Sequence, residues 1–460
     1  MFKKILKAGQ PIFETRPHLV PSGHITPGIT AIEYFNRREK LASKLPNSSL
    51  AIIKGSNIKF ASGSVFYPFQ QNNNLFYLSG WNEPDSCGII EKDESGNVKF
   101  HMIVPPHDPA VEQWEGERTG VENVQEIFNA DIGISNLNLN THLQKLLATY
   151  KNVYCDIENR HDKIEKILRE NGSIIYPLKN LVESIRIVKS NAELRVMRQA
   201  GRISGEVYNA AYGKKFSTEK GLAAFLEYGF IMNGCDKNAY VPVVAGGDHA
   251  LCIHYVRNDD KFKDDNLVLV DAAGSLGGYC SDISRTWPVN GKFTNYQRDL
   301  YEAVLEVQKR LINECMAKNG HSLNDLHNLS VNWMTESLKN VGFSNLQSWE
   351  CAKYLYPHYV GHNLGLDVHD CPTHSRNAKL LKGQVITIEP GVYIPDDPRW
   401  PKEFRGIGIR IEDDVAVGET NYVVLTKEAA KEVDEIESIA REGGYLELEE
   451  EVVDIANLLK

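Results

Sequence analysis

The first part of the chain alternates short apolar runs with stretches of helical periodicity. Short runs rich in β-branched and aromatic residues are typical of strands, and here they lie at 50–60, 75–81, 88–90, 100–104 and 153–156. Apolar residues that recur every three or four positions indicate helices, here at about 33–42, 121–128 and 138–148. This alternation predicts an α/β domain, which we place at 31–180 after an irregular N-terminal extension over 1–30.

A different order of elements begins near residue 180. A helix pattern over 181–188 precedes Ser190-Asn191-Ala192-Glu193, which has the form of a capping box at the start of a long helix. The later elements are helices at about 218–233, 295–317 and 322–340, strands within 240–255 and 267–287, and strand and loop to about 425 before an acidic helix. We predict a second domain over 181–440 and a C-terminal tail over 441–460.

Two aspartates flank the turn of the hairpin predicted at 267–287. Asp271 ends the first apolar run, and Asp282 lies in the second run after a glycine-rich turn. If the turn centres on Leu276 and Gly277, the two aspartates face each other with Cβ atoms about 4.5–5.5 Å apart. Carboxylates that close repel unless a cation or a shared proton lies between them. Taken alone, a pair of this kind is more often two solvated residues beside a loop.

Length and composition exclude some classes of partner. At 460 residues the chain is too long for one ordinary core, so at least two domains are expected. The formal net charge of -10 argues against nucleic acid or an anionic membrane surface as the main partner. No apolar run approaches the roughly 18 residues that a membrane helix needs.

Cysteine usage and the N-terminal residues bear on the compartment. The eight cysteines form no C-x-x-C pair, so we expect reduced thiols in an intracellular compartment and no zinc ribbon. The segment 1–8 is basic and lacks acidic residues, like the start of a very short mitochondrial transit peptide. A solvated basic start would have the same composition.

Further polar residues accompany the two aspartates at the ends of apolar strands or in a histidine-rich stretch. They are His254, His358, His362, His369, Glu389, Arg410 and Glu412. Each alone has an ordinary structural explanation, such as a surface histidine or a turn glutamate. His358 and His362 have the spacing of H-E-x-x-H, but no glutamate follows His358, so a mononuclear zinc site is disfavoured. Four carboxylates with one imidazole suit two divalent metals, such as manganese, cobalt or zinc.

The order and surroundings of these residues resemble the pita-bread metallopeptidases, the family of methionine aminopeptidase, prolidase and aminopeptidase P. The motifs that carry the resemblance lie at 270–274, 281–287, 361–370, 387–393 and 408–413. Residues 67–84 and 114–120 resemble the N-terminal domain of aminopeptidase P. Over about 8–440 the chain is most similar to the fungal mitochondrial intermediate-cleaving peptidases within that family.

The resemblance implies an α+β pita-bread catalytic domain at 181–440 that holds two Mn²⁺, with Co²⁺ or Zn²⁺ as alternatives. The implied ligands are Asp271, Asp282, His362, Glu389 and Glu412. The metals would activate a water for attack on the scissile carbonyl, with Glu389 as general base.

Roles for other residues are implied in the same way. His254 and His369 would hydrogen-bond the reacting groups, and His358 would line the pocket for the second substrate residue. Arg410 would orient the ligand carboxylates, with Tyr393 as a further pocket residue. Trp114 would reach an active site, that of a neighbouring subunit in a homodimer, although it reads equally well as a surface tryptophan.

The function implied is removal of one N-terminal residue from peptides or proteins, as a trimming step on mitochondrial proteins after presequence cleavage. The alternatives within enzymes are a general Xaa-Pro aminopeptidase and a dipeptide-specific prolidase. An inactive binding homologue or a metal-free creatinase-like hydrolase is disfavoured because all five ligands are present. A mitochondrial location is expected, with the cytoplasm as the alternative.

Overall fold

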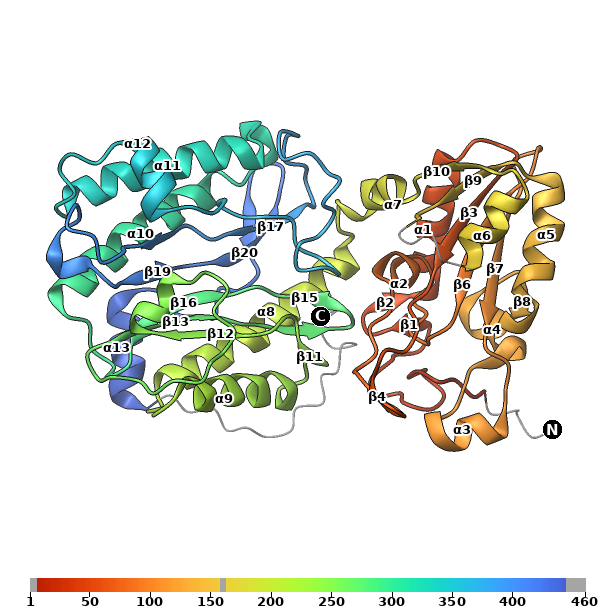
Figure 1. The fold of residues 1–460 in the computed structure, drawn as a ribbon, viewed down its shortest axis with the longest axis horizontal. Helices are drawn as coiled ribbons and strands as arrows, with labels where there is room; N and C mark the ends of the chain where they lie inside the picture. Colours follow the sequence, from red (N-terminus) through yellow and green to blue (C-terminus); the bar gives the residue numbers. More distant parts are fainter. Residues whose placement is uncertain (1–5, 158–162, 444–460) are drawn as a thin grey trace. The chain divides into compact units, whose positions relative to one another are not determined.

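The computed structural model describes residues 6–157 and 163–443, so most of segment 1–8 and of the tail predicted at 441–460 lies outside the described residues (Figure 1). The chain divides into two compact units between Arg186 and Ile187, and each is described by itself. Within the described ranges, no helix is both long and apolar enough to cross a membrane.

The N-terminal unit is built on a mixed six-stranded sheet with strand order β10-β9-β3-β6-β7-β8. β3, β6 and β7 pair antiparallel, whereas β9, β10 and β8 join them as parallel strands. The sheet strands are β3 (Ser49–Lys54), β6 (Cys87–Lys92), β7 (Val98–Val104), β8 (Ile132–Ser135), β9 (Asn152–Cys155) and β10 (Ile174–Tyr176). Two short pairs are β1 (His24–Thr26) with β2 (Ile29–Thr30) and β4 (Phe60–Ser62) with β5 (Val65–Phe66).

The N-terminal unit has seven α-helices among the described residues, and several of them, such as α4 and α5, pack against the sheet. The helices are α1 (Ala31–Lys44), α2 (Asn73–Ser79), α3 (Pro109–Glu115), α4 (Gly120–Phe128), α5 (Leu139–Thr149), α6 (Lys163–Glu170) and α7 (Lys179–Arg186). Ile52, Ile89 and Val153 from the sheet share one buried core with Leu147 of α5 and Leu168 of α6. The α/β character expected for this half of the chain is therefore confirmed.

The strand predicted at 75–81 is wrong, because this segment forms the helix α2. Asn72 caps the helix, since its Oδ1 accepts hydrogen bonds from the backbone N–H groups of Asn74 (2.9 Å) and Leu75 (3.2 Å). Gly80 ends it in the left-handed conformation with φ of 72°, which glycine adopts without a steric penalty. Every residue from Leu75 to Ser79 is buried, so the continuous apolar run gave no helical period.

The C-terminal unit places small antiparallel sheets between two pairs of helices (Figure 1). Its strands are β11 (Lys237–Asn238), β12 (Val243–Gly246), β13 (Leu267–Asp271), β14 (Gly274–Leu276), β15 (Tyr279–Cys280), β16 (Ser284–Pro288), β17 (Val385–Ile388), β18 (Gly391–Tyr393), β19 (Gly408–Arg410), β20 (Asp413–Val417) and β21 (Tyr422–Val424). Its helices are α8 (Asn191–Tyr212), α9 (Glu219–Met232), α10 (Asn295–Asn313), α11 (Leu323–Asn340), α12 (Ser348–Glu350) and α13 (Val433–Glu442). The capping box predicted at Ser190 and Glu193 is present at the start of α8.

Only part of the strand prediction within 240–255 is right. β12 ends at Gly246, and the residues that follow form a short 3-10 helix over Gly247–Leu251. Gly247 has a positive φ of 58°, a conformation that interrupts a strand. The loop beyond this turn carries His254.

The hairpin register also differs from the sequence prediction. Leu276 pairs with Tyr279, so the turn centres on Gly277 and Gly278, and both have positive φ, 56° and 85°. Two-residue hairpin turns of this kind need positive φ at both central positions, which two glycines supply. Asp271 therefore lies opposite Ser284 and not opposite Asp282. A shift of two residues keeps both aspartates on the same face of the hairpin.

Candidate active site in the C-terminal unit

The predicted ligand carboxylates all lie at strand ends or between strands. Asp271 is the last residue of β13, and Asp282 lies between β15 and β16. Glu389 follows β17 directly, and Glu412 lies between β19 and β20. Because the small sheets fix the strand ends, side chains far apart in sequence meet at one place.

His362 is brought to these carboxylates by a loop that is bonded to β17. Its backbone N–H donates to Thr387 Oγ1 (3.1 Å), and its carbonyl accepts from the Thr387 N–H (2.9 Å). His362 Nε2 then lies 3.4 Å from Asp282 Oδ2 and 3.5 Å from Glu389 Oε1. Ligand atoms of Asp282, His362 and Glu412 lie within 4.8 Å of one another, a spacing that suits a metal ion.

Tyr240 joins the two aspartates. Its hydroxyl lies 2.6 Å from Asp271 Oδ1 and 2.6 Å from Asp282 Oδ1. A hydroxyl has one proton to donate, so Tyr240 satisfies one of these carboxylate oxygens at a time. The other needs a proton or a cation, and the donor set therefore fits a divalent metal.

The pKa values of the site show an excess of negative charge. Burial raises the pKa of Asp271, raises that of Glu389 to about 7, and raises that of Glu412 well above its usual range, with the neighbouring carboxylates acting in the same direction. Burial alone would lower the pKa of His362, but the hydrogen bond with Asp282 and the charge of Glu389 outweigh it and raise that pKa to about 9. Such a cluster is stabilised when cations bind.

Arg410 is the buried cation that organises these carboxylates. Its Nη2 donates to Asp271 Oδ2 (2.7 Å), and its Nε donates to Ser284 Oγ (2.9 Å). Ser284 Oγ in turn donates to Glu412 Oε2 (2.6 Å). One guanidinium therefore fixes Asp271 directly and Glu412 through a serine.

His358 and Tyr393 form a hydrogen-bonded chain that starts at Arg410. Arg410 Nη1 donates to the Tyr393 hydroxyl (2.8 Å), which lies 2.9 Å from His358 Nε2. His358 Nδ1 donates to the Tyr359 carbonyl (2.8 Å). Burial lowers the pKa of His358 to about 3, so its ring is neutral and Nε2 accepts from Tyr393.

The comparisons with known proteins match both units of the chain. The family described as Metallopeptidase family M24 matches residues 195–419, and that described as Aminopeptidase P, N-terminal domain, matches residues 34–154. The chain is 52% identical to "Intermediate cleaving peptidase 55" of Saccharomyces cerevisiae, covering 97% of this chain and 91% of that protein. This chain belongs to metallopeptidase family M24.

Further relatives of this M24 peptidase agree. "Intermediate cleaving peptidase 55, mitochondrial" of Arabidopsis thaliana is 38% identical over 94% of this chain and 87% of its own length. The crystal structure of Icp55 from Saccharomyces cerevisiae superposes with a TM-score of 0.87 and 52% identity, covering 92% of this chain and all of that one. Aminopeptidase P of E. coli in complex with product superposes with a TM-score of 0.85 and 29% identity, over 90% and 99% of the two chains.

The expected family and fold are thereby confirmed. The chain is a metal-dependent aminopeptidase with an aminopeptidase P-type N-terminal domain and a pita-bread catalytic domain. The family also makes a divalent metal its cofactor, and the cluster of Asp282, His362 and Glu412 is a place for it.

Two further candidate histidines of the M24 peptidase, His369 and His254, lie near this cluster. The His369 ring centroid is 4.4 Å from that of His362, and burial lowers the pKa of His369. His254 is exposed, in a loop held by the buried carboxylate of Glu219. Glu219 accepts hydrogen bonds from the Gly246 N–H, His249 Nδ1, the Tyr255 hydroxyl and the Asp260 N–H, all at 2.9 Å.

Trp114 belongs to the other unit of the M24 peptidase. It lies on α3 and is 87% exposed, as a surface tryptophan would be. Its contribution to an active site stays a prediction.

Several residues that contact the predicted ligands were not predicted from the sequence, among them Ser284 and Tyr240. Ser284 lies two residues beyond Asp282, and the correct hairpin register would have placed it opposite Asp271. Tyr240 lies in a stretch without a motif of its own, and no sequence signal links it to the aspartates. Both are found only when the strands are placed in space.

Proposed function

We propose that this M24 peptidase is a dimanganese aminopeptidase that removes a single N-terminal residue, trimming mitochondrial proteins after presequence cleavage. The observation that carries the proposal is the convergence of Asp271, Asp282, His362, Glu389 and Glu412 in one largely buried site. Four carboxylates and one imidazole suit two Mn²⁺ ions, with Co²⁺ or Zn²⁺ as alternatives. The names of the yeast and Arabidopsis relatives support the trimming role and the mitochondrial location.

When bound, the metal ions would lower the pKa of a water towards neutrality and polarise the scissile carbonyl. Glu389 would take a proton from that water and pass it to the leaving amine. Thr387 Oγ1, 3.3 Å from Glu389 Oε1, would hold the carboxyl in place.

The histidines and Arg410 would act on the substrate and on the ligands. His369, beside the ligand His362, and His254, in the exposed loop, would donate hydrogen bonds to the oxygen or nitrogen on which charge develops. His358 and Tyr393 would line the pocket for the second residue. Arg410 would keep Asp271 oriented for metal binding.

A general Xaa-Pro aminopeptidase is the second candidate, favoured by the structural match to aminopeptidase P of E. coli. Prolidase activity is distinguished by substrate length, because a dipeptide-specific enzyme fails on longer peptides. An inactive binding homologue is disfavoured by the complete ligand set.

We also propose a homodimer in which Trp114 reaches the partner's active site.

The test combines metal binding with substrate identification. Metal-free protein titrated with Mn²⁺ should bind about two ions per chain and gain aminopeptidase activity that chelators remove. N-terminal profiling of mitochondrial proteins, with and without the protein, should show one extra residue on a defined set in its absence. Full activity without metal, or cleavage confined to Xaa-Pro peptides, would reject the proposal.

A further inference from the structure

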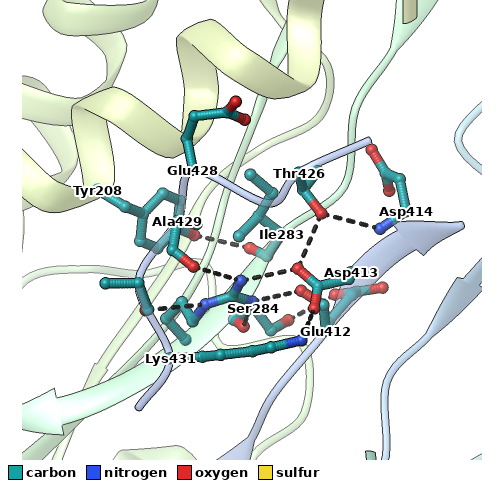
Figure 2. Close-up of polar contacts among 12 residues, drawn as sticks. Tyr208, Ile283, Ser284, Glu412, Asp413, Asp414, Thr426, Glu428, Ala429 and Lys431 are labelled. Carbon is teal, nitrogen blue, oxygen red and sulfur yellow. Dashed lines mark hydrogen bonds and ion pairs between the residues drawn. The ribbon is translucent and has the colours of Figure 1, made fainter. Parts of the chain in front are cut away.

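A group of charged side chains, two of them fully buried, lies beside β16, which carries Ser284, and β20, which begins after Glu412. Arg285 on β16 donates through Nη2 to Asp413 Oδ1 on β20 (2.7 Å), and both side chains are fully buried. Lys431, in the segment before α13, donates to the other oxygen of Asp413. Figure 2 shows Asp413 between Lys431 and Thr426. We call Arg285, Asp413 and Lys431 the charge centre.

Arg285 reaches the backbone of the two residues whose side chains face the site. Its Nη1 donates to the Ser284 carbonyl (2.9 Å) and to the Glu412 carbonyl. The Glu412 N–H donates to the same Ser284 carbonyl (3.0 Å). The guanidinium therefore fixes the position of Glu412 relative to Ser284, and their side chains are joined by the hydrogen bond from Ser284 Oγ to Glu412 Oε2.

The C-terminal segment 426–431 holds the charge centre from the other side. Asp413 also accepts from Thr426 Oγ1 (2.8 Å) and Gln308 Nε2 (2.7 Å). Arg285 also donates to the carbonyls of Ala429 (2.9 Å) and Ala430 (3.2 Å). The charge centre thus connects a segment outside the five-ligand set to the backbone of Ser284 and Glu412.

We infer that the charge centre positions Glu412, and that segment 426–431 thereby sets the affinity of the metal site to which Glu412 belongs. The inference rests on the proposed dimetal function. A buried ion pair adds little net stability, because the loss of hydration offsets the attraction between the charges. Its specific effect is the geometry it imposes, here on the backbone on both sides of a ligand. Outer partners of this kind typically change metal affinity by about 10- to 100-fold.

The first experiment titrates metal-free variants with Mn²⁺ by calorimetry. Lys431→Met removes one cation of the charge centre. The Mn²⁺ affinity of one of the two sites should fall by about 10-fold or more. Lys431→Arg keeps the charge and should restore most of the affinity. Lys309→Met is the matched control, because Lys309 pairs with Glu432 next to Lys431 on the surface and should leave both sites unchanged.

The second experiment measures hydrogen–deuterium exchange in the metal-free proteins, which needs no metal binding. Lys431→Met should speed exchange over 281–288 and 408–417, whereas Lys309→Met should not. If wild-type protein binds no metal, the proposed function fails while this measurement still tests the positioning. If Lys431→Met fails to fold, Thr426→Val, which removes one donor and no charge, is judged by the same two measurements. Unchanged affinity in a folded Lys431→Met or Thr426→Val protein would overturn the inference.

Discussion

The hydroxyl of Tyr240 lies 2.6 Å from a carboxylate oxygen of Asp271 and equally close to one of Asp282. Burial and the neighbouring carboxylates raise the pKa of Tyr240 well above its usual range, so the phenol stays protonated. Its single proton reduces the repulsion between two carboxylates, and a bound cation would take over that role. Tyr240 therefore contributes most to stability when the protein is metal-free.

This argument predicts the effect of Tyr240→Phe on stability. In the metal-free protein the substitution leaves the aspartates without their shared donor and should cost about 1–3 kcal/mol of unfolding free energy. With saturating Mn²⁺ the cost should be smaller. Denaturant unfolding with and without chelator measures both values. Tyr77→Phe is the control, because Tyr77 and its acceptor, the Ile185 carbonyl, both belong to the N-terminal unit. The stability lost in this variant should not depend on metal.

Glu389 and His369 should separate metal binding from transition-state stabilisation. Glu389→Gln removes the charge of a proposed ligand that is also the proposed base, so both metal content and turnover should fall. His369→Ala should keep both metals and lose roughly 10²–10³ in kcat, as for the removal of one transition-state donor. Asp271→Asn should resemble Glu389→Gln in metal content. The measurements are metal content and steady-state kinetics for each variant. Loss of metal from the His369 variant would show that the role given to His369 is wrong.

Glu219 should make stability depend on pH. Burial acts to raise its pKa, but the hydrogen bonds from His249, Gly246, Asp260 and Tyr255 outweigh burial and lower it. A carboxyl with a lowered folded-state pKa stabilises the protein above its unfolded pKa of about 4.3. That contribution is lost as the pH falls through the folded-state pKa.

Glu219→Gln tests this dependence. The substitution should cost about 1–3 kcal/mol at pH 7, and the difference from wild type should shrink as the pH falls below about 4.3. Unfolding free energies at pH 7 and at acidic pH provide the measurement. Glu302→Gln, at a half-exposed surface position, should show no such trend. A difference that stays constant with pH would contradict the role given to the Glu219 carboxylate.

Lys189 and Asp370 form a buried ion pair that holds the loop of His369. Their charged atoms are 2.8 Å apart, and both side chains are 1% exposed. Lys189→Met removes the cation that neutralises Asp370 and should cost roughly 3–5 kcal/mol. The double variant Lys189→Met/Asp370→Leu should recover most of that loss, because no buried charge remains uncompensated. Chemical unfolding of the single and double variants measures this recovery, and equal losses in both would refute the prediction.

The sequence predicted the site at the level of its motifs because strand-ending carboxylates and the histidine-rich stretch are local patterns. Asp271, Glu389 and Glu412 were identifiable because each follows or interrupts an apolar strand. The register between Asp271 and Asp282 was not predicted correctly, because the two adjacent glycines Gly277 and Gly278 allow more than one turn centre. The sequence pattern did not decide which pair of residues would adopt positive φ.

Other parts of the fold depended on contacts that no local pattern contains. The sequence of α2 has the pattern of a strand because Leu75 to Ser79 are all buried, and only the Asn72 cap and Gly80 indicate a helix. Tyr240 meets the aspartates through pairing of its neighbours with β13 and β14. The contacts between Arg285 and segment 426–431 join residues more than 140 positions apart, which only the folded chain brings together.

The hydrogen-bonded chain from Arg410 through Tyr393 to His358 has a fixed polarity. Arginine can only donate, so the Tyr393 oxygen accepts a hydrogen bond from Arg410, and the Tyr393 O–H donates to His358 Nε2. His358 Nδ1 must then donate to the Tyr359 carbonyl, and both ring nitrogens are engaged. If His358 lines the pocket for the second substrate residue, as proposed, it presents the edge and face of a neutral ring, and we expect it to discriminate between side chains by their shape and not by proton exchange.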